Sequence, residues 1–277
     1  MITTLKILPA EPLRNYIDYY TLRIIDTQGE TVFKPQWATE QLHWLFSLLK
    51  HPFKHVLPQG NTNDISVYKQ YLIGLYTKYF GYHIFSGTYK LLSVEFNATG
   101  FYFLFGIPMP LLKNKILATD EVLSKNYNEL EESLINAEAF HDMKRLLDSF
   151  FTTQLNESNY PGSQHNIVKA YRLIKKGINC TTQQLADIVF MGVRNFELQF
   201  EKQIGVTPAF LMRLTRFNKA VAMKKASNEL SWTNIAYACD YFDQNHLIKD
   251  FKTFAGLTPN ASFNLMPQPK ENEVFIG

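Results

Sequence analysis

The chain has 277 residues, of which 46% are hydrophobic and 19% are charged, and its formal net charge is +3. This balance excludes an intrinsically disordered chain, and the length predicts two folded domains. The longest apolar run, from Phe101 to Leu112, is too short to cross a bilayer, and the residues before Pro9 lack the apolar segment of a signal peptide. We therefore expect a cytoplasmic protein that does not enter a membrane.

The positive charge is concentrated in the second half of the chain. Residues 163–266 carry 13 Lys and Arg against 7 Asp and Glu, a net charge of +6, whereas residues 1–162 have a net charge of −2. A basic region beside a slightly acidic one indicates a polyanionic partner. By itself this asymmetry does not say which polyanion is bound.

The first 110 residues are rich in aromatic and β-branched residues, which favour strands. In LLSVEF, residues 91–96, polar and apolar side chains alternate with the period of two of a half-buried strand. We expect residues 87–108 to form two strands around a turn at 97–100, while QLHWLFSLL, residues 41–49, fits either a strand or a helix. The pattern predicts an antiparallel β-sandwich or a small barrel.

From residue 128 the hydrophobic period changes to that of a helix. In residues 128–155, apolar side chains recur every three or four positions, with acidic residues early and basic residues later. This pattern predicts one amphipathic helix, or two with a break near Ala137. Its apolar face either packs within the chain or forms the seam of a dimer. The polar segment 156–164, which contains Pro161 and Gly162, is the predicted linker.

The second half contains an internal repeat, formed by residues 183–208 and 233–259. Four residues recur after 51 positions, in the pairs Phe200 and Phe251, Gly205 and Gly256, Thr207 and Thr258, and Pro208 and Pro259. An earlier Leu/Ile-Ala pair recurs after only 50 positions, so the second copy has one more residue in the turn between. Two copies are too few for a solenoid, so we interpret them as a duplicated supersecondary unit.

Each copy has the pattern of a helix-turn-helix. The alanine of the Leu/Ile-Ala pair lets a second helix pack closely across the first, and a short turn follows. Asp243 is placed to cap the second helix of the second copy, because its carboxylate can accept backbone N–H bonds. Gly205 and Gly256 are expected to end the second helices. Between the copies, PAFLMRLTRFNKAVAMKKA, residues 208–226, predicts a long helix that fixes the separation of the two units.

Residues 235–259, IAYACDYFDQNHLIKDFKTFAGLTP, resemble the signature of the AraC/XylS family of transcriptional regulators. Residues 165–265 match the DNA-binding domain of this family throughout, and the N-terminal half resembles its cupin-like sensor regions more loosely. The resemblance implies a bacterial transcription regulator that binds double-stranded DNA, is a homodimer and contacts RNA polymerase. Its N-terminal domain would sense a small-molecule effector or mediate dimerisation. We expect no enzymatic activity, no cofactor and no metal.

These observations predict an α+β protein with an N-terminal antiparallel β-sandwich or barrel, cupin-like in fold, and a C-terminal all-α domain. The predicted divisions are a β-rich sensor domain at 1–127, a helical dimerisation or connecting segment at 128–155, a linker at 156–164, a DNA-binding domain at 165–266 and a polar tail at 267–277. The two helix-turn-helix units, joined by a long helix, are expected at about 181–204 and 231–255.

A recognition helix enters the major groove, where its solvent-facing side chains reach base edges and flanking cations hold phosphates. The base-reading candidates are Arg194, Asn195, Glu197, Leu198 and Gln199 in the first unit, and Gln244, Asn245, His246 and Lys249 in the second. The phosphate-binding candidates are Lys202, Arg213, Arg216 and Lys252. Leu198 stands where the family commonly has arginine, and Gly192 replaces a usual capping serine. We therefore expect weaker or more shape-dependent readout from the first unit.

One acidic and histidine-containing cluster allows another interpretation. Asp243, His246 and Asp250 lie three and four residues apart, as metal ligands on one helix face do. The first copy has no matching set, so capping and surface roles are favoured. Asp250 has no assigned role, and we expect it to point away from DNA or to pair with a basic residue. The cysteines Cys180 and Cys239 lack the spacing of a zinc site.

The competing functional hypothesis is a cupin-like sugar-binding protein or enzyme with an accessory helical domain. A set of aromatic residues supplies the candidates for a ligand pocket, although a role in the sheet core is favoured for them. These residues are Trp37, Trp44, Phe101, Phe103 and Phe105. The sequence contains no Gly-rich phosphate loop, nucleophile elbow or metal triad, so the regulator is favoured.

Overall fold

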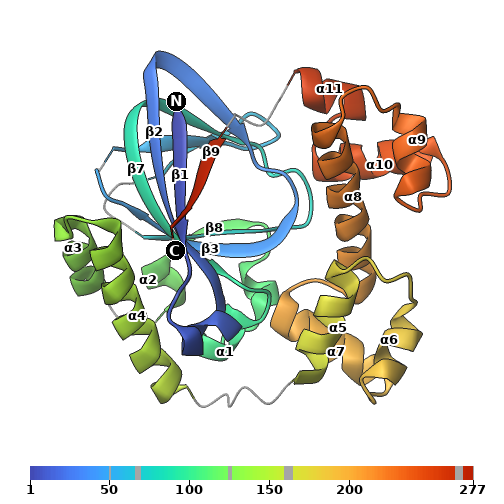
Figure 1. Ribbon diagram of the computed structural model, residues 1–277, viewed down its shortest axis with the longest axis horizontal. Helices are drawn as coiled ribbons and strands as arrows, with labels where there is room; N and C mark the ends of the chain where they lie inside the picture. Colours follow the sequence, from blue (N-terminus) through green and yellow to red (C-terminus); the bar gives the residue numbers. More distant parts are fainter. Residues whose placement is uncertain (50, 66–69, 124–126, 159–164, 266–270, 277) are drawn as a thin grey trace.

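The computed structural model describes residues 1–49, 51–65, 70–123, 127–158, 165–265 and 271–276 (Figure 1). We call residues 1–158 the N-terminal domain and residues 165–265 the C-terminal domain. The first is built on a sheet and the second is helical, so the predicted α+β class is confirmed. Most of the predicted linker, residues 159–164, lies outside the described residues.

One sheet forms the framework of the N-terminal domain. Its strands are β1 (Ile2–Ile7), β2 (Ile17–Pro35), β3 (Thr39–Ser47), β4 (Phe53–Val56), β5 (Thr62–Ile65), β6 (Tyr71–Tyr76), β7 (Tyr82–Phe96), β8 (Lys115–Ala118) and β9 (Glu271–Ile276). The order is β8-β6-β3-β7-β2-β1-β9, and β4 pairs with β7 and β5. The pairs are antiparallel except for β1 and β9. The ambiguous segment QLHWLFS is therefore a strand, within β3.

Two long strands run through the middle of this sheet. β2 and β7 contain 19 and 15 residues and pair along most of their length. Their register shifts near Tyr19 and again between Asp26 and Thr31. Because such irregularities bend a strand and increase its twist, the sheet curls instead of lying flat (Figure 1). The curled sheet leaves one face for the helices to cover.

A short helix replaces the second strand expected within residues 87–108, so that prediction is wrong. After β7 the chain enters α1 (Gly100–Phe105), in which all residues but the last are buried. An apolar run without alternation fits a buried helix as well as a strand, because burial on all sides removes the polar positions. Gly100 permits the entry, since a Cβ there would lie 1.8 Å from the carbonyl oxygen of Tyr16.

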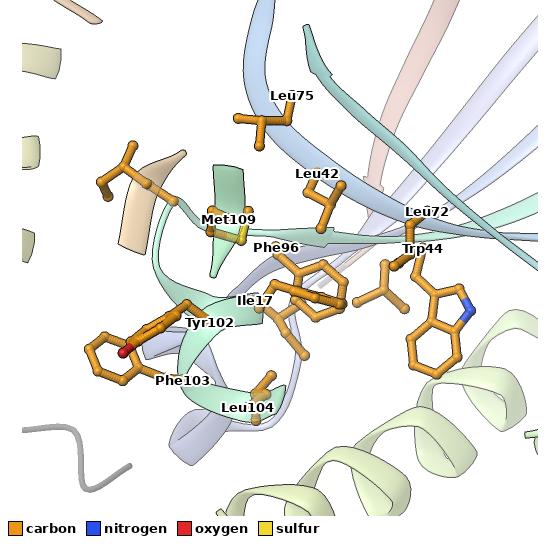
Figure 2. Close-up of a cluster of buried hydrophobic side chains, with 14 of the residues drawn as sticks. Ile17, Leu42, Trp44, Leu72, Leu75, Phe96, Tyr102, Phe103, Leu104 and Met109 are labelled. Carbon is orange, nitrogen blue, oxygen red and sulfur yellow. The ribbon is translucent and has the colours of Figure 1, made fainter. Parts of the chain in front are cut away.

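The main hydrophobic cluster lies between the sheet and the helices (Figure 2). Trp44 of β3 is fully buried, and its ring centroid lies 5.3 Å from that of Phe46. Full burial of a large apolar side chain contributes about 3 kcal/mol, so aromatic residues dominate this core. Shorter helices complete the domain, namely η1 (Glu11–Asn15), η2 (Met109–Leu112) and α2 (Thr119–Val122).

The amphipathic segment forms two helices, α3 (Asn128–Asn136) and α4 (Phe140–Glu157), so the second of the two predicted alternatives, with a break near Ala137, is the correct one. The buried residues of α4 belong to the main cluster and are Phe140, Met143, Leu147 and Phe151. Phe151 lies 6.1 Å, ring centroid to ring centroid, from Trp44 of the sheet. Packing within the chain accounts for this apolar face, which is therefore not exposed as a dimer seam.

The C-terminal domain is a succession of helices. They are α5 (His165–Lys175), α6 (Thr182–Ile188), α7 (Val193–Ile204), α8 (Pro208–Ala226), α9 (Trp232–Ala238), α10 (Gln244–Phe254) and α11 (Pro259–Asn264). The long helix expected between the repeats is α8, with 19 residues. In the part of the chain that the structure describes, no helix is both long and apolar enough to cross a membrane.

The segment expected to be a polar tail contains a strand, β9, that pairs with β1. Residues 266–270 and 277 lie outside the described residues. The sequence ENEVFI has no clear period of two, so its strand conformation depends on the partner strand and is not encoded locally.

Candidate DNA-binding surface

The first helix-turn-helix unit consists of α6, a turn and α7. A capping box begins α6, because Thr181 Oγ1 accepts the backbone N–H of Gln184 at 3.2 Å and Gln184 Oε1 accepts that of Thr181 at 2.8 Å. Ala186 is fully buried, as close packing of the two helices requires. Phe200 anchors α7 in the core, and Gly205 ends it with φ of 88°.

The second unit repeats this arrangement with α9, a turn and α10. Ser231 caps α9 by accepting the backbone N–H of Asn234 at 3.2 Å. Asp243 caps α10 by accepting the backbone N–H of His246 at 2.7 Å, which confirms the predicted cap. Phe251 is fully buried and packs against α8. Both predicted units are therefore present, with their recognition helices α7 and α10.

The N-terminal halves of both recognition helices face solvent. The exposed candidates for base reading are Arg194, Asn195, Glu197 and Leu198 on α7, and Gln244, Asn245, His246 and Lys249 on α10. Gln199 is half-buried, and its Oε1 accepts a bond from Gln203 Nε2 at 3.5 Å. Gln244 Oε1 accepts a bond from Thr233 Oγ1 at 3.1 Å, so α9 orients this amide.

The four predicted phosphate-binding residues have different surroundings. Lys252 is exposed on α10. Lys202 is also exposed, but its Nζ lies 5.7 Å from the ring centroid of Tyr102 in the N-terminal domain. Arg213 and Arg216 lie on α8 and bond within the second unit. These two arginines therefore stabilise the domain and also contribute positive charge to its surface.

Asp250 is buried at the centre of a polar network in the second unit. Its Oδ1 accepts a bond from Arg213 Nη2 at 2.6 Å, and its Oδ2 accepts one from the hydroxyl of Tyr241 at 3.2 Å. The expected pairing with a basic residue is thus confirmed. Burial, reinforced by the charge of Asp250, raises the pKa of Tyr241, which keeps its hydroxyl protonated as a donor. The network ties α8, α10 and the turn together.

Basic residues of α8 also bind the end of α9. Arg216 Nη1 donates to the carbonyl oxygen of Asp240 at 3.2 Å, and its guanidinium lies 5.1 Å from the ring centroid of Tyr241. Lys219 Nζ donates to the carbonyl oxygen of Ala238 at 2.7 Å. The last carbonyls of a helix lack intrahelical partners and carry partial negative charge, so cations are favourable there.

The metal interpretation of Asp243, His246 and Asp250 is not favoured by these contacts. Asp243 caps a helix, and Asp250 binds Arg213 and Tyr241. Across the described ranges, no group of three or more His, Cys, Asp and Glu side chains is arranged to hold a metal ion.

The C-terminal ends of both recognition helices contact the N-terminal domain. An added Cβ on Gly205 would lie 2.6 Å from Leu75 Cδ2, and one on Gly256 would lie 2.6 Å from the Tyr79 ring. Both glycines have positive φ, 88° and 83°. The glycine of the repeated motif is therefore required twice over in each copy, by its backbone conformation and by the neighbouring domain.

Backbone hydrogen bonds and an ion pair extend this interface. The N–H of Tyr79 donates to the carbonyl oxygen of Thr253 at 2.8 Å, and the N–H of Ala38 donates to that of Phe254 at 2.9 Å. Near the first unit, Lys175 of α5 forms an ion pair with the buried carboxylate of Glu40. The N-terminal domain thus contacts both units at the C-terminal ends of α7 and α10. The N-terminal halves of these helices stay exposed.

The aromatic residues predicted to line a ligand pocket do not form one cluster. Trp44 and Phe101 are fully buried in the N-terminal core, where Phe105 packs against the Trp44 ring. Trp37 instead packs against α8 of the C-terminal domain. Phe103 lines a cavity of about 480 Å³ between the N-terminal domain and α5. The five residues therefore have at least three different environments.

Sequence reasoning missed three exposed aromatic residues beside the recognition helices. Phe190 is 93% exposed, Phe242 is 85% exposed and Tyr237 is 74% exposed. Phe190 also has φ of 56°, in the left-handed region that bulky residues rarely adopt. For Phe190 and Phe242 the available signal was an aromatic residue in a turn, where the helical period gives it no core position, whereas Tyr237 lies within α9.

Comparison with known proteins gives one match for each domain. Residues 185–264 match a family described as a helix-turn-helix domain, and residues 5–118 match a domain of unknown function, DUF6597. Similar solved structures include ToxT from Vibrio cholerae O395, with 13% identity, coverage of 89% of this chain and 97% of that chain, and a TM-score of 0.46. Unsaturated fatty acid bound wild-type ToxT from Vibrio cholerae strain SCE256 has 13% identity, coverage of 91% and 98%, and a TM-score of 0.43. No curated protein matches the chain.

The two helix-turn-helix units and the family match define a DNA-binding transcription regulator. Residues 185–264 therefore form a helix-turn-helix domain of the AraC type, which is the domain that the repeated motif predicted.

Proposed function

We propose that the chain is a sequence-specific regulator that reads double-stranded DNA with α7 and α10 and responds to a small molecule sensed by the N-terminal domain. The main support for this proposal is that the N-terminal halves of both recognition helices are exposed, whereas their C-terminal ends contact the N-terminal domain. A recognition helix contacts base edges with its N-terminal residues, so the exposed halves are the ones that a groove receives.

The side chains of the second unit are suited to direct base reading. Gln244 and Asn245 can bond adenine through two hydrogen bonds, and Lys249 can donate to guanine acceptors. Each good contact of this kind discriminates against the wrong base by about 1–3 kcal/mol. In the first unit Arg194 supplies a donor for guanine, and Leu198 offers an apolar contact for a thymine methyl group. Two units in one chain would occupy successive stretches of the major groove on one face of the duplex.

One segment of the N-terminal domain is placed to couple ligand binding to both units. Leu75, which contacts the end of α7, and Tyr79, which contacts the end of α10, are four residues apart. Leu75 is fully buried with φ of 54°, a strained conformation for leucine. A shift of this segment would move both contacts together. The cavity beside α5, lined by Phe103 and Arg172 among others, is a candidate place for an effector.

The first experiment measures binding of the full chain to genomic DNA fragments at 50 mM and 200 mM salt. We expect the affinity to fall by about 100-fold or more, because counterions are released from several phosphates. Affinity that is absent, or that does not change with salt, would contradict the proposal. Selection of the bound fragments then supplies the operator for the variants below.

Base reading and phosphate binding are separated by two variants of α10. Gln244→Ala should lower affinity for the selected operator while leaving affinity for unrelated DNA unchanged. Lys252→Ala should weaken binding to all sequences alike. Lys252 is the cleaner phosphate probe, because removal of Arg213 also breaks the bond to Asp250. Equal loss on every sequence for Gln244→Ala would mean that this face does not read bases.

A homodimer and a contact with RNA polymerase stay predictions. The apolar face of α4 is buried within the chain, so a dimer would need another surface. Sedimentation equilibrium of the full chain, with and without operator DNA, measures whether two copies associate.

A further inference from the structure

Strand β9 brings the chain back to the N-terminal domain after the second helix-turn-helix unit. It pairs in parallel with β1, from Ile2 opposite Glu271 to Ile7 opposite Ile276. β1 is paired on its other side with β2, so β9 is an added strand at the end of the sheet order. Figure 1 shows β9, in red, lying beside β1 and apart from the helices of its own end of the chain.

The first residue of β9 is held by its side chain. The carboxylate of Glu271 accepts bonds from Thr4 Oγ1 at 2.9 Å and Arg23 Nε at 3.2 Å, and it forms an ion pair with Lys34. Only 16% of the Glu271 side chain is exposed. Although burial acts to raise it, the charges of Lys34 and Arg23 lower the pKa of Glu271 to about 2. The three donors therefore form a pocket specific for a carboxylate.

The two cations of this pocket need an anion between them. Lys34 and Arg23 are both largely buried, with 20% of each side chain exposed. Burial, followed by the charge of Arg23, lowers the pKa of Lys34 to about 8, even though Glu271 and, more weakly, Glu95 act to raise it. Two like charges in such a setting repel each other unless a carboxylate neutralises them. An empty pocket would thus retain a preference for acidic partners.

The middle of β9 is held more loosely than its two ends. Asn272, Glu273 and Val274 are exposed, and Phe275 is also exposed, although its ring centroid lies 5.6 Å from that of Tyr19. Ile276 is half-buried and packs against the main cluster. Glu273 forms an ion pair with Lys6 at 3.4 Å, but 46% of its side chain is exposed, and exposed pairs add little stability. If β9 detached, β1 would keep its pairing with β2. The strand can therefore leave without unfolding the sheet.

We propose that Thr4, Arg23 and Lys34, together with the edge of β1, form a binding site for an extended acidic peptide, and that residues 271–276 occupy it as a releasable intramolecular ligand. In recognition by strand addition, backbone bonds supply affinity and a side-chain pocket supplies specificity, as the ladder and the Glu271 pocket do here. Because six residues, 265–270, separate α11 from β9, the occupied site tethers the second unit to the N-terminal domain.

The first test measures amide hydrogen exchange of residues 272–276 in the full chain. Glu271→Gln keeps the shape of the side chain but removes the charge that the pocket binds. We expect exchange to rise at least tenfold at those of these amides that bond to β1, with exchange in β2 and β7 unchanged. Glu273→Gln, which removes the exposed ion pair of the same strand, is the matched control and should change exchange less than threefold. An equal response of both variants, or none from Glu271→Gln, would overturn the proposal.

The second test supplies the strand as a separate molecule. The probe is a fluorescent, N-acetylated peptide of residues 271–277, ENEVFIG, titrated into the wild-type chain and into the Glu271→Gln chain. We expect the peptide to bind the variant at least tenfold more tightly, because the weakened tail competes less well. Replacement of the first Glu of the peptide by Gln, or Arg23→Gln in the variant, should remove this binding. Failure of the peptide to bind a chain whose tail exchanges freely would show that the edge is no peptide site.

The consequence for DNA rests on the proposed function, whereas peptide binding does not. Operator affinity of the wild type and of Glu271→Gln is therefore measured with and without the peptide. If no form of the chain binds DNA, the proposed function fails, and the exchange and peptide results still decide whether the site exists.

Discussion

The two helix-turn-helix units share their apolar framework but differ in their polar supports. In the second unit, Asp243 caps α10 and Asp250 binds Arg213 and Tyr241. In the first, Gly192 begins α7 with no side-chain cap, and Gln199 stands at the position of Asp250. Both units therefore need the buried alanine, the buried phenylalanine and the glycine that ends the second helix in order to fold. The polar groups differ between the units, and they determine how much each recognition helix is stabilised.

The units also differ in what holds their turns. The basic residues of α8 bind the end of α9 and its turn, through Arg216 and Lys219. The first unit packs on α5, its apolar core is continuous with the main cluster of the N-terminal domain, and Lys113 forms an ion pair with Glu201 of α7 at 3.4 Å. The second unit has a hydrophobic cluster of its own, to which the N-terminal domain adds Trp37 and Ala38, and it also accepts the backbone bonds of Ala38 and Tyr79. The core of the first unit therefore depends more on contacts that a change in the N-terminal domain would alter.

The largest expected effect follows from breaking the Asp250 network. Asp250→Ala leaves Arg213 and Tyr241 without their acceptor, and we expect it to lower the free energy of unfolding by about 2–3 kcal/mol. Half of the Arg213 side chain is exposed, so water partly replaces the lost contact and keeps the cost below that of a fully buried pair. Urea unfolding of the full chain measures the change in the free energy of unfolding. Hydrogen exchange in α10 then shows whether the loss of stability lies in the second unit.

The matched control is Gln199→Ala at the equivalent position of α7. Gln199 is half-buried and makes a long bond to Gln203, so its loss should cost no more than about 0.5 kcal/mol. Comparable losses from both substitutions would mean that the two units are held equally, and the contrast drawn above would be wrong.

A second contrast concerns base reading at equivalent positions of the two recognition helices. Lys249 and Leu198 are 51 residues apart and both are exposed. Lys249→Ala should lower affinity for the selected operator about tenfold, or about 1.4 kcal/mol, because a charged donor to a base edge is lost. Leu198→Ala should have a smaller effect, since an apolar contact with a thymine methyl group contributes less. Binding titrations at one fixed salt concentration measure both.

The reverse substitution supplies the sharper test. Leu198→Lys places in the first unit the donor that the second unit already has, and it should raise affinity for DNA carrying a guanine at the corresponding step. A larger loss from Leu198→Ala than from Lys249→Ala would assign the main reading role to the first unit.

Much of the C-terminal domain could be predicted because its signals are local. The repeat fixes the positions of the helix ends, and Asp243 follows from the capping rule applied to one residue. The sequence suggested that Asp250 could pair with a basic residue, but it did not say which one. The partner, Arg213, lies 37 positions away, and no local pattern identifies this residue. The assignment of Arg213 and Arg216 to phosphates rests on charge alone, which does not distinguish a surface cation from one that also bonds inside the domain.

The N-terminal domain was predictable in class but not in detail. Residues 100–105 are apolar throughout and all but the last are buried, so they carry no period that separates a helix from a strand. β9 is a strand because β1 and a carboxylate pocket lie beside it, and neither is visible in the sequence of residues 271–276. The ligand-pocket candidates were chosen as aromatic residues, a property that core residues such as Trp44 share.

A smaller effect is expected at the starts of the recognition helices. Asp243→Ala removes the side-chain cap of α10 and should lower the free energy of unfolding by about 1 kcal/mol. At the equivalent position, Gly192→Ser should raise it by a few tenths, about 0.3 kcal/mol, because serine can accept a free backbone N–H of α7. Gly192 has negative φ, −65°, and no atom lies within 4 Å of a Cβ added there. Chemical unfolding of the two variants measures both changes. It shows whether a side-chain cap added to α7 stabilises the first unit.

Another small effect concerns the turns that precede the recognition helices. Phe190 and Asp240 occupy equivalent positions with φ of 56° and 58°, but aspartate tolerates this conformation better than phenylalanine. Phe190→Gly should therefore raise the free energy of unfolding by about 0.5 kcal/mol, the relief of strain being partly offset by the greater freedom of glycine in the unfolded chain. Asp240→Gly should change it less. The ring of Phe190 is exposed, so packing does not explain why phenylalanine occupies this position. The effect of Phe190→Gly on operator affinity is therefore the informative measurement. A Phe190→Gly chain that is more stable but binds DNA less tightly would assign the ring to recognition, and would make the first unit a reader by an aromatic contact where the second uses amides and Lys249.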